Sequence, residues 1–254
     1  MGLFDFFKTK SKPTTTSQQK KADRPECDIS KTQMMIDLFA VDKSKRDQNW
    51  EKDFFENVKT ASFTCDEPQV TVGPDGFPYF ALLVPEPQKP FSSFCIKNIK
   101  DDFLLDKGVG ITVNPKSNSV EWVFTYGDIV NLHVNNEFYT QRENVEIKSE
   151  ETIEKEEELL VAQPSESYLP KQARNVIRKF LQEKGIKQPK IVMICRKTQG
   201  TIVQELAFNI FREDFASSAQ LNNIMRQISW FLPRHYIIVS FPKNSSLSGS
   251  FNNL

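Results

Sequence analysis

The second half of the chain alternates between strand-like and helical apolar patterns in a regular order, and this order constrains the fold more than any other feature. A short apolar run at 159–161 predicts a strand, and Pro170 suits the first turn of a helix. That helix would bury a stripe formed by Ala173, Val176, Ile177, Phe180 and Leu181. Strand patterns at 191–195 and 205–211, a helical stripe at 221–232 and a strand at 236–241 follow. The order β-α-β-β-α-β predicts a ferredoxin-like domain over residues 157–243, with both helices on one sheet face.

The first half mixes both kinds of pattern. Trp50, Phe54, Phe55 and Val58 predict a helix at about 49–60, and strand patterns follow at 69–72, 79–84, 110–114 and 119–125. These elements indicate an N-terminal α+β domain over residues 26–142, whose topology stays open. The predicted fold class is therefore α+β, with this mixed domain followed by the ferredoxin-like one.

Charge is balanced overall, at 33 basic and 33 acidic residues, but it is unevenly distributed. Residues 1–24 are net basic, and 143–158 hold eight Glu and two Lys. Residues 165–244 carry 13 basic and five acidic residues. We therefore expect a disordered basic tail at 1–25, an acidic linker at 143–156 and a basic C-terminal domain. The Ser- and Asn-rich residues 244–254 are expected to form a second disordered tail.

The chain carries no pattern of export or membrane insertion. No apolar run approaches the roughly 20 residues that a membrane span needs. The Gly2–Phe7 segment is too short for a signal-peptide core, and the alternatives are a frayed start or a short turn that touches a membrane. The four cysteines are scattered without metal-ligand spacing, so we expect reduced thiols, no metal site and a cytoplasmic location. The oligomeric state stays open.

Two features together resemble a known family. A Val113-Asn114-Pro115-Lys116-Ser117 turn lies near the end of the first domain, and a helix with an early proline opens a second domain of α-β-β-α-β order. This arrangement is similar to the SseB (enhanced serine sensitivity) family of bacterial cytosolic proteins, across residues 50–241. Lys116 stands where that family usually has glycine. The resemblance implies a non-enzymatic two-domain protein and supplies no catalytic residue.

Catalytic residue sets are missing from the sequence. His133 and His235 are the two histidines, and the phosphate-loop, dinucleotide, serine-hydrolase and zinc-protease motifs do not occur. Cys195 and His235 could pair as thiolate and imidazolium, although a strand cysteine is usually a buried, inert thiol. The acidic pairs at 101–102 and 213–214 fit caps and turns. We therefore expect no catalytic residue and no cofactor, and an enzyme with an unrecognised site is kept as an alternative.

Binding functions remain. RNA binding by the basic C-terminal domain needs exposed aromatic residues on the open sheet face, where the pattern places Ala207, Asn209 and Phe211. That is a poor stacking surface, so nucleic acid is not favoured. We expect instead a partner that is another protein, and a regulatory, adaptor or immunity-type binding module.

One helix face carries the densest basic surface of the chain. Lys171, Arg174, Arg178 and Lys179 form this basic strip, with 171, 174 and 178 spaced as neighbours on a helix. The strip is the predicted partner-binding site. The acidic residues 150–158 are close in the chain, so neutralisation within the molecule is the competing explanation.

Overall fold

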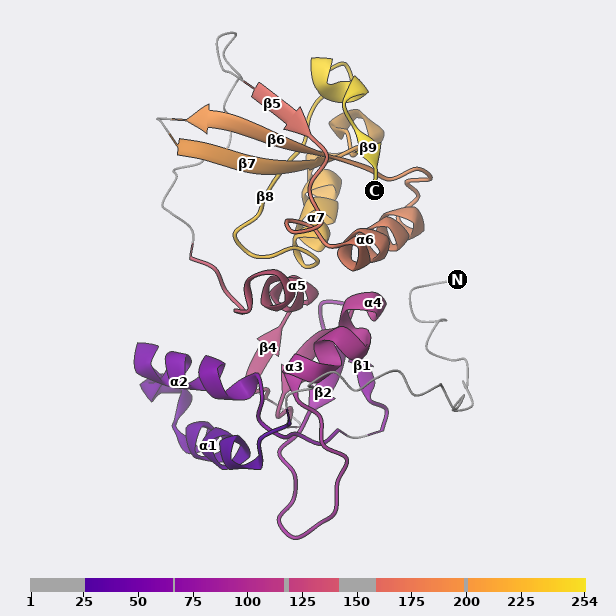
Figure 1. Cartoon of the computed structure of the whole chain (residues 1–254). Helices are drawn as coiled ribbons and strands as arrows, with labels where there is room; N and C mark the ends of the chain where they lie inside the picture. Colours follow the sequence, from indigo (N-terminus) through magenta and orange to yellow (C-terminus); the bar gives the residue numbers. More distant parts are fainter. Residues whose placement is uncertain (1–25, 66, 117–118, 142–158, 199–200) are drawn as a thin grey trace, which may run out of the picture. The chain divides into compact units, whose positions relative to one another are not determined.

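The chain divides into two compact units, Met1–Thr125 and Tyr126–Leu254, and both combine helices with a β-sheet. The computed structural model describes residues 26–65, 67–116, 119–141, 159–198 and 201–254 (Figure 1). The predicted α+β class is confirmed. The Gly2–Phe7 segment, the basic tail at 1–25 and the acidic linker at 143–156 lie outside the described residues.

The first unit begins with helices and continues with a sheet. Its elements are α1 (Ile29–Ala40), η2 (Lys43–Lys45), α2 (Gln48–Val58), β1 (Val70–Val72), β2 (Pro78–Leu82), α3 (Ile96–Ile99), η3 (Lys100–Leu104), α4 (Leu105–Lys107), β3 (Gly110–Val113) and β4 (Trp122–Phe124). Asp28 and Asp47 stand immediately before α1 and α2, and their carboxylates accept hydrogen bonds from first-turn amides. Because these amides have no partner within the helix, the two aspartates determine where the helices begin.

The sheet of the first unit has the strand order β1-β2-β3-β4. β2 and β3 are parallel, and the other two pairs are antiparallel. Parallel neighbours need a crossover connection, which α3, η3 and α4 provide. All five residues of β2 are buried, so this strand forms the centre of the sheet. The strand patterns at 69–72, 79–84, 110–114 and 119–125 predicted these four strands correctly.

Aromatic rings join α2 to the end of this sheet. The Phe54 ring lies 5.1 Å from the ring of Trp50 and 5.1 Å from that of Trp122 in β4. Phe55 meets Trp122 edge-on at 5.3 Å. Aromatic pairs at these separations add stabilisation beyond their buried area. Much of the aromatic content of the first half therefore serves packing.

The second unit contains the remaining elements. They are α5 (Tyr126–Asn135), β5 (Leu159–Ala162), α6 (Lys171–Glu183), β6 (Lys190–Thr198), β7 (Thr201–Phe208), η4 (Arg212–Asp214), α7 (Ser218–Ser229), β8 (Ile237–Val239), η5 (Ser246–Gly249) and β9 (Asn252–Asn253). From β5 to β8 the predicted order β-α-β-β-α-β is correct. Ser217 caps α7 by accepting a hydrogen bond from the Gln220 amide.

The strand order of the second sheet departs from the predicted ferredoxin-like arrangement. The order is β5-β6-β7-β8, so strands that follow one another in sequence are neighbours in the sheet. In the split β-α-β pattern, another strand separates the two that a helix connects. Here β5 pairs directly with β6 in antiparallel fashion, and β7 pairs directly with β8 in parallel. The ferredoxin-like prediction failed because element order and crossover handedness leave open which strands become neighbours.

One face of this sheet forms a core with α6 and α7 (Figure 1). Leu206 and Phe208 of β7 are 0% and 1% exposed, and Ile228 of α7 is 0% exposed. The ring of Phe180 in α6 lies 4.8 Å from that of Phe231, just after α7. The helical stripes read from the sequence therefore identify the buried faces of both helices correctly.

The opposite sheet face is covered by residues 241–251. Leu247 of η5 packs with Val192, Ile194 and Ala207, and the half-buried rings of Phe241 and Phe251 complete this second core. β9 pairs with the first residues of β6, and β5 pairs with later residues of β6. The two short strands therefore lie along the same edge of β6. The predicted disorder of 244–254 is wrong: η5 and β9 form there, Leu247 and Leu254 are buried, and Phe251 is half-buried against the sheet.

α5 packs against the end of α7. The amide of Gly127 donates a hydrogen bond of 3.0 Å to the carbonyl oxygen of Trp230, and the Tyr126 and Trp230 rings stack at 6.3 Å. A Cβ atom on Gly127 would lie 1.9 Å from the carbonyl oxygen of Leu232. Glycine is therefore needed where the two backbones approach each other.

Candidate functional site

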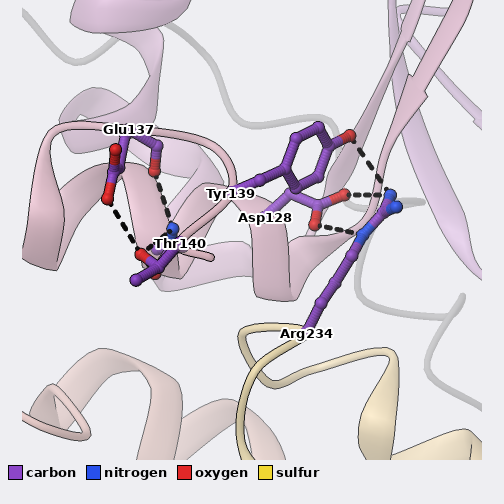
Figure 2. Close-up of polar contacts among 6 residues, drawn as sticks. Asp128, Glu137, Tyr139, Thr140 and Arg234 are labelled. Carbon is purple, nitrogen blue, oxygen red and sulfur yellow. Dashed lines mark hydrogen bonds and ion pairs between the residues drawn. The ribbon is translucent and has the colours of Figure 1, made fainter. Parts of the chain in front are cut away.

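Among the described residues of the second unit, the most completely buried carboxylate belongs to Asp128 in the first turn of α5. Its side chain is 0% exposed and forms a two-pronged ion pair with Arg234, which lies between α7 and β8. The distances are 2.9 Å from Nε to Oδ1 and 3.0 Å from Nη2 to Oδ2 (Figure 2). Because both carboxylate oxygens accept from one guanidinium, the pair has the fixed geometry of an Arg–carboxylate fork.

Tyr139 also contacts the Arg234 guanidinium. The guanidinium carbon lies 4.3 Å from the centre of the Tyr139 ring, and Nη2 donates to the Tyr139 hydroxyl at 3.2 Å. Burial lowers the pKa of Arg234, but the hydrogen bond and negative charge of Asp128 outweigh it, so this pKa lies above its ordinary value. The pair therefore stays charged and holds α5 in place, which is a structural role.

A separate group of hydrogen bonds joins α5 to the chain that follows it. Asn131 is 1% exposed. Its side-chain amide donates to the Glu137 main-chain carbonyl oxygen at 2.9 Å and to Thr140 Oγ1 at 3.1 Å. Thr140 in turn donates to the Glu137 carboxylate at 3.0 Å (Figure 2). We call Asp128, Asn131, Tyr139, Thr140 and Arg234 the Asp128 cluster. It ties residues 137–140 back onto α5.

A second buried ion pair connects β6 and β7. Arg196 Nη2 lies 2.6 Å from Glu205 Oε1, and these side chains are 10% and 3% exposed. The register places both on the sheet face that residues 241–251 cover, since Glu205 is opposite Ile194. Buried beneath another segment, this pair is out of reach of a substrate.

The arginines and the lysines of the predicted basic strip have different surroundings. Arg174 donates through Nε to the Leu169 carbonyl oxygen at 2.8 Å and through Nη2 to that of Pro164. Arg178 donates to the main-chain oxygen of Leu254 and, at 2.8 Å, to Asn175 Oδ1. Burial lowers the pKa of Arg174. The two arginines thus join α6 to neighbouring backbone.

The two lysines of the strip, Lys171 and Lys179, lie on the exposed side of α6. All four predicted residues are on one helix, and partner binding by the strip stays a prediction. The acidic residues 150–158, its proposed internal counterpart, lie outside the described residues.

The residues considered for catalysis occupy separate places. Cys195 is half-buried in β6, opposite Leu160 and Gln204, and His133 is exposed on α5. His235 lies in the turn before β8, with its ring edge-on to that of Tyr236 at 4.7 Å. Within the described ranges, no group of three or more His, Cys, Asp and Glu side chains is arranged to hold a metal ion.

The acidic pair 213–214 has a structural role. Both carboxylate oxygens of Glu213 accept from the Lys243 amide, at 3.4 and 3.3 Å, and Asp214 pairs with the Lys243 ammonium at 3.1 Å. These contacts anchor the start of the segment that covers the sheet, as the interpretation of caps and turns suggested.

Sequence reasoning missed an exposed apolar surface on the second sheet. Leu160 in β5 is 72% exposed and Ile202 in β7 is 69% exposed. Leu160 is opposite Cys195, Cys195 is opposite Gln204, and Ile202 is two residues from Gln204, so all lie on one face. We call Leu160, Cys195 and Ile202 the hairpin patch. It lies on the α6/α7 face, towards the turn that joins β6 and β7.

Comparisons of the chain with protein-family models, with curated proteins and with solved structures give no match. Across the part of the chain that the structure describes, no helix has both the length and the apolar character needed to cross a membrane.

Proposed function

We propose that the protein is a non-enzymatic, regulatory or adaptor-like binding module that docks an extended apolar segment of another protein along the outer edge of β5. One observation carries the proposal: Leu160 in the edge strand and Ile202 two strands inward, in β7, are 72% and 69% exposed on the same sheet face. Large apolar side chains gathered at one place are typical of interaction surfaces.

The edge of β5 supplies the polar half of such a site. β5 pairs with β6 on one side, and no other described strand pairs with it. An edge strand presents unpaired N–H and C=O groups, which an extended peptide can pair with as an added strand. Side chains of the added strand alternate between the two faces, so every second one would lie on the face of the hairpin patch, next to Leu160, and longer side chains would extend over it towards Ile202. The chemistry thus favours a segment with apolar residues at alternate positions.

RNA binding through the second unit has less support from the same contacts. Ala207, which was expected to face outwards, is 0% exposed and packs with Leu247. The Phe211 ring lies 6.0 Å from that of Phe251, so a base has no open platform there. Retention on heparin over a salt series tests this alternative, because phosphate binding weakens steeply as salt rises. The enzyme alternative has no cluster to support it among the described residues.

The family relationship and location belong to the same proposal. The turn at Asn114 and Pro115 connects β3 to β4, and the elements α6 to β8 have the α-β-β-α-β order on which the SseB-like resemblance rests. We accordingly propose a bacterial cytosolic protein, in keeping with four cysteines that are present as thiols.

The test selects ligands from a random peptide display library on the purified chain and measures their binding by fluorescence anisotropy. Selected peptides are expected to have apolar residues at alternate positions and to bind at least tenfold more weakly to Leu160→Asp and Ile202→Asp variants. A peptide N-methylated on its edge-pairing amides should also bind more weakly. Met34→Asp is the matched control, since Met34 is 50% exposed in α1 of the other unit. Selection of no peptide, or of peptides indifferent to the β5 and β7 variants, would contradict the proposal.

A further inference from the structure

Two cysteines of the first unit, Cys27 and Cys95, lie side by side although 67 other residues separate them in the chain. The Cys27 side chain is near enough to the Cys95 thiol to influence its pKa. Asn98, one helical turn beyond Cys95, donates its side-chain amide to Cys27 Sγ at 3.7 Å. The Cys27 sulfur therefore lies against the first turn of α3, next to the second thiol.

Backbone pairing on both sides holds this arrangement in place. The Asp28 amide, next to Cys27, donates to the Thr60 carbonyl oxygen at 2.7 Å. Phe94, next to Cys95, exchanges two hydrogen bonds of 2.8 Å with Phe63. Residues 60–63 thus form hydrogen bonds both with the backbone next to Cys27 and with the backbone next to Cys95. Because both segments pair with the same stretch of chain, the two cysteines are not on independently moving loops.

The two thiols differ in accessibility. Cys27 is half-buried, so a small reagent can reach it, whereas Cys95 is 0% exposed. Burial, together with the nearby Cys27 side chain, raises the pKa of Cys95 to about 12. The thiolate is the reactive form in disulfide exchange, so Cys27 is the group that reacts first.

We propose that Cys27 and Cys95 form a reversible disulfide on exposure to a low-molecular-weight disulfide such as oxidised glutathione, and that this bond locks the segment before α1 onto α3. In the first step the Cys27 sulfur attacks one sulfur of the reagent, its S–S bond breaks, and one reagent thiol leaves. In the second step the Cys95 sulfur attacks the Cys27 sulfur and displaces the other reagent thiol. The two chain thiols lose two electrons and two protons, and the reagent gains both.

The cross-link has a measurable physical consequence. It closes a long loop that includes α1, α2, β1 and β2, and so restricts the unfolded chain. For a loop of this length we expect the oxidised form to show a Tm for the first unit that is higher by on the order of 10 °C. The inference is independent of the proposed docking function, because β5 lies in the other unit.

The experiment treats the full chain with oxidised glutathione and analyses it by intact-mass and peptide mass spectrometry. The wild-type chain is expected to lose two hydrogens and to yield one cross-linked peptide that joins Cys27 to Cys95, both reversed by dithiothreitol. Cys95→Ser should stop with one glutathione on Cys27, and Cys27→Ser should leave Cys95 reduced. A Cys65→Ser/Cys195→Ser double variant, which retains only the proposed pair, should behave like the wild type.

Three outcomes would overturn the inference. They are a wild-type chain that stays fully reduced, one that keeps glutathione on Cys27, and one whose disulfide includes Cys65 or Cys195. The wild-type peptide map decides between these results without any variant. If Cys95→Ser does not fold by circular dichroism, Cys95→Ala serves in its place.

Discussion

The ion pair of Asp128 and Arg234 predicts that substitution of its two partners lowers the free energy of unfolding by different amounts. Asp128 is 0% exposed in its side chain, whereas the Arg234 side chain is 58% exposed. If Asp128→Asn removes the negative charge, Arg234 can be hydrated where it stands, so the loss is limited to charge-assisted hydrogen bonds. We expect a decrease of about 1–2 kcal/mol in the free energy of unfolding.

Arg234→Ala leaves the buried carboxylate without its counter-charge. Breaking a buried pair from one side costs about 3–5 kcal/mol, and we expect the lower end, about 3 kcal/mol, because removal of the guanidinium admits water. The double variant Asp128→Asn/Arg234→Ala should recover part of this loss, since it leaves no buried charge.

The pH dependence of the Arg234→Ala variant follows from the same burial. A carboxyl group without a counter-charge binds a proton more readily in the folded than in the unfolded state, so its folded-state pKa is raised. Stability linked to a raised pKa is present at low pH and is lost as pH rises through that pKa. The deficit of Arg234→Ala relative to wild type should therefore shrink as pH falls from 7 towards about 5.

Urea unfolding followed by circular dichroism measures these losses, and hydrogen exchange of peptides from 126–141 assigns them to α5 and the Asp128 cluster. Lys243→Ala is the control, because its partnership with Asp214 is exposed and should contribute less than about 1 kcal/mol. An Asp128→Asn loss equal to or larger than that of Arg234→Ala would refute the reasoning.

Four further predictions concern packing and the basic strip. Phe208→Ala and Ile228→Ala should each lower the free energy of unfolding by about 2–5 kcal/mol, and losses below about 0.5 kcal/mol at both would contradict their burial. Leu247→Ala should cost about 2 kcal/mol and speed hydrogen exchange at Val192 and Ile194, whereas unchanged exchange would mean that residues 241–251 do not protect that face. Gly127→Ala should cost more than about 2 kcal/mol in urea unfolding, because its Cβ would lie 1.9 Å from a carbonyl oxygen, while Gly249→Ala, with nothing within 4 Å, should change little. Arg174→Glu should lower the thermal midpoint by several degrees through lost backbone contacts, and Lys171→Glu should not; equal midpoints would show that Arg174 contributes no such anchoring.

Local features of the fold were predictable where they depend on local chemistry. The stripe of α6 is visible in sequence because helical periodicity involves neighbouring residues, and the same reasoning narrows the cap of α7 to Ser217 or Ser218, of which the structure uses Ser217. The pairing of β5 with β6 depends on which strand edges of the sheet are available to β5, and the residues 159–162 carry no pattern that selects one strand as the neighbour. The C-terminal segment was misjudged because Leu247 and Phe251 are isolated among serines and asparagines, and composition averages over them.

The candidate site was predictable only in part. The basic strip was found from spacing, but spacing does not indicate that Arg174 and Arg178 donate to backbone oxygens. Asp128 carries a weak signal, as a carboxylate that precedes the apolar residues 129–130 in a helix, and its partner is 106 positions away. The hairpin patch has no sequence signal, because Leu160 and Ile202 look like ordinary strand residues until the helices are placed.

The long separations within the second unit have a consequence for the order in which it folds. β6 and β7 pair across a short turn, from Thr198 opposite Thr201 to Ile191 opposite Phe208, so this hairpin can form in about 1–10 μs. The contact of Asp128 with Arg234 closes 106 positions and carries a larger entropic barrier. We therefore expect α5 to dock after the rate-limiting step, so that weakening its ion pair accelerates unfolding and leaves the folding rate almost unchanged. The contact then determines the unfolding rate, and so the lifetime of the native state, without affecting how fast that state forms.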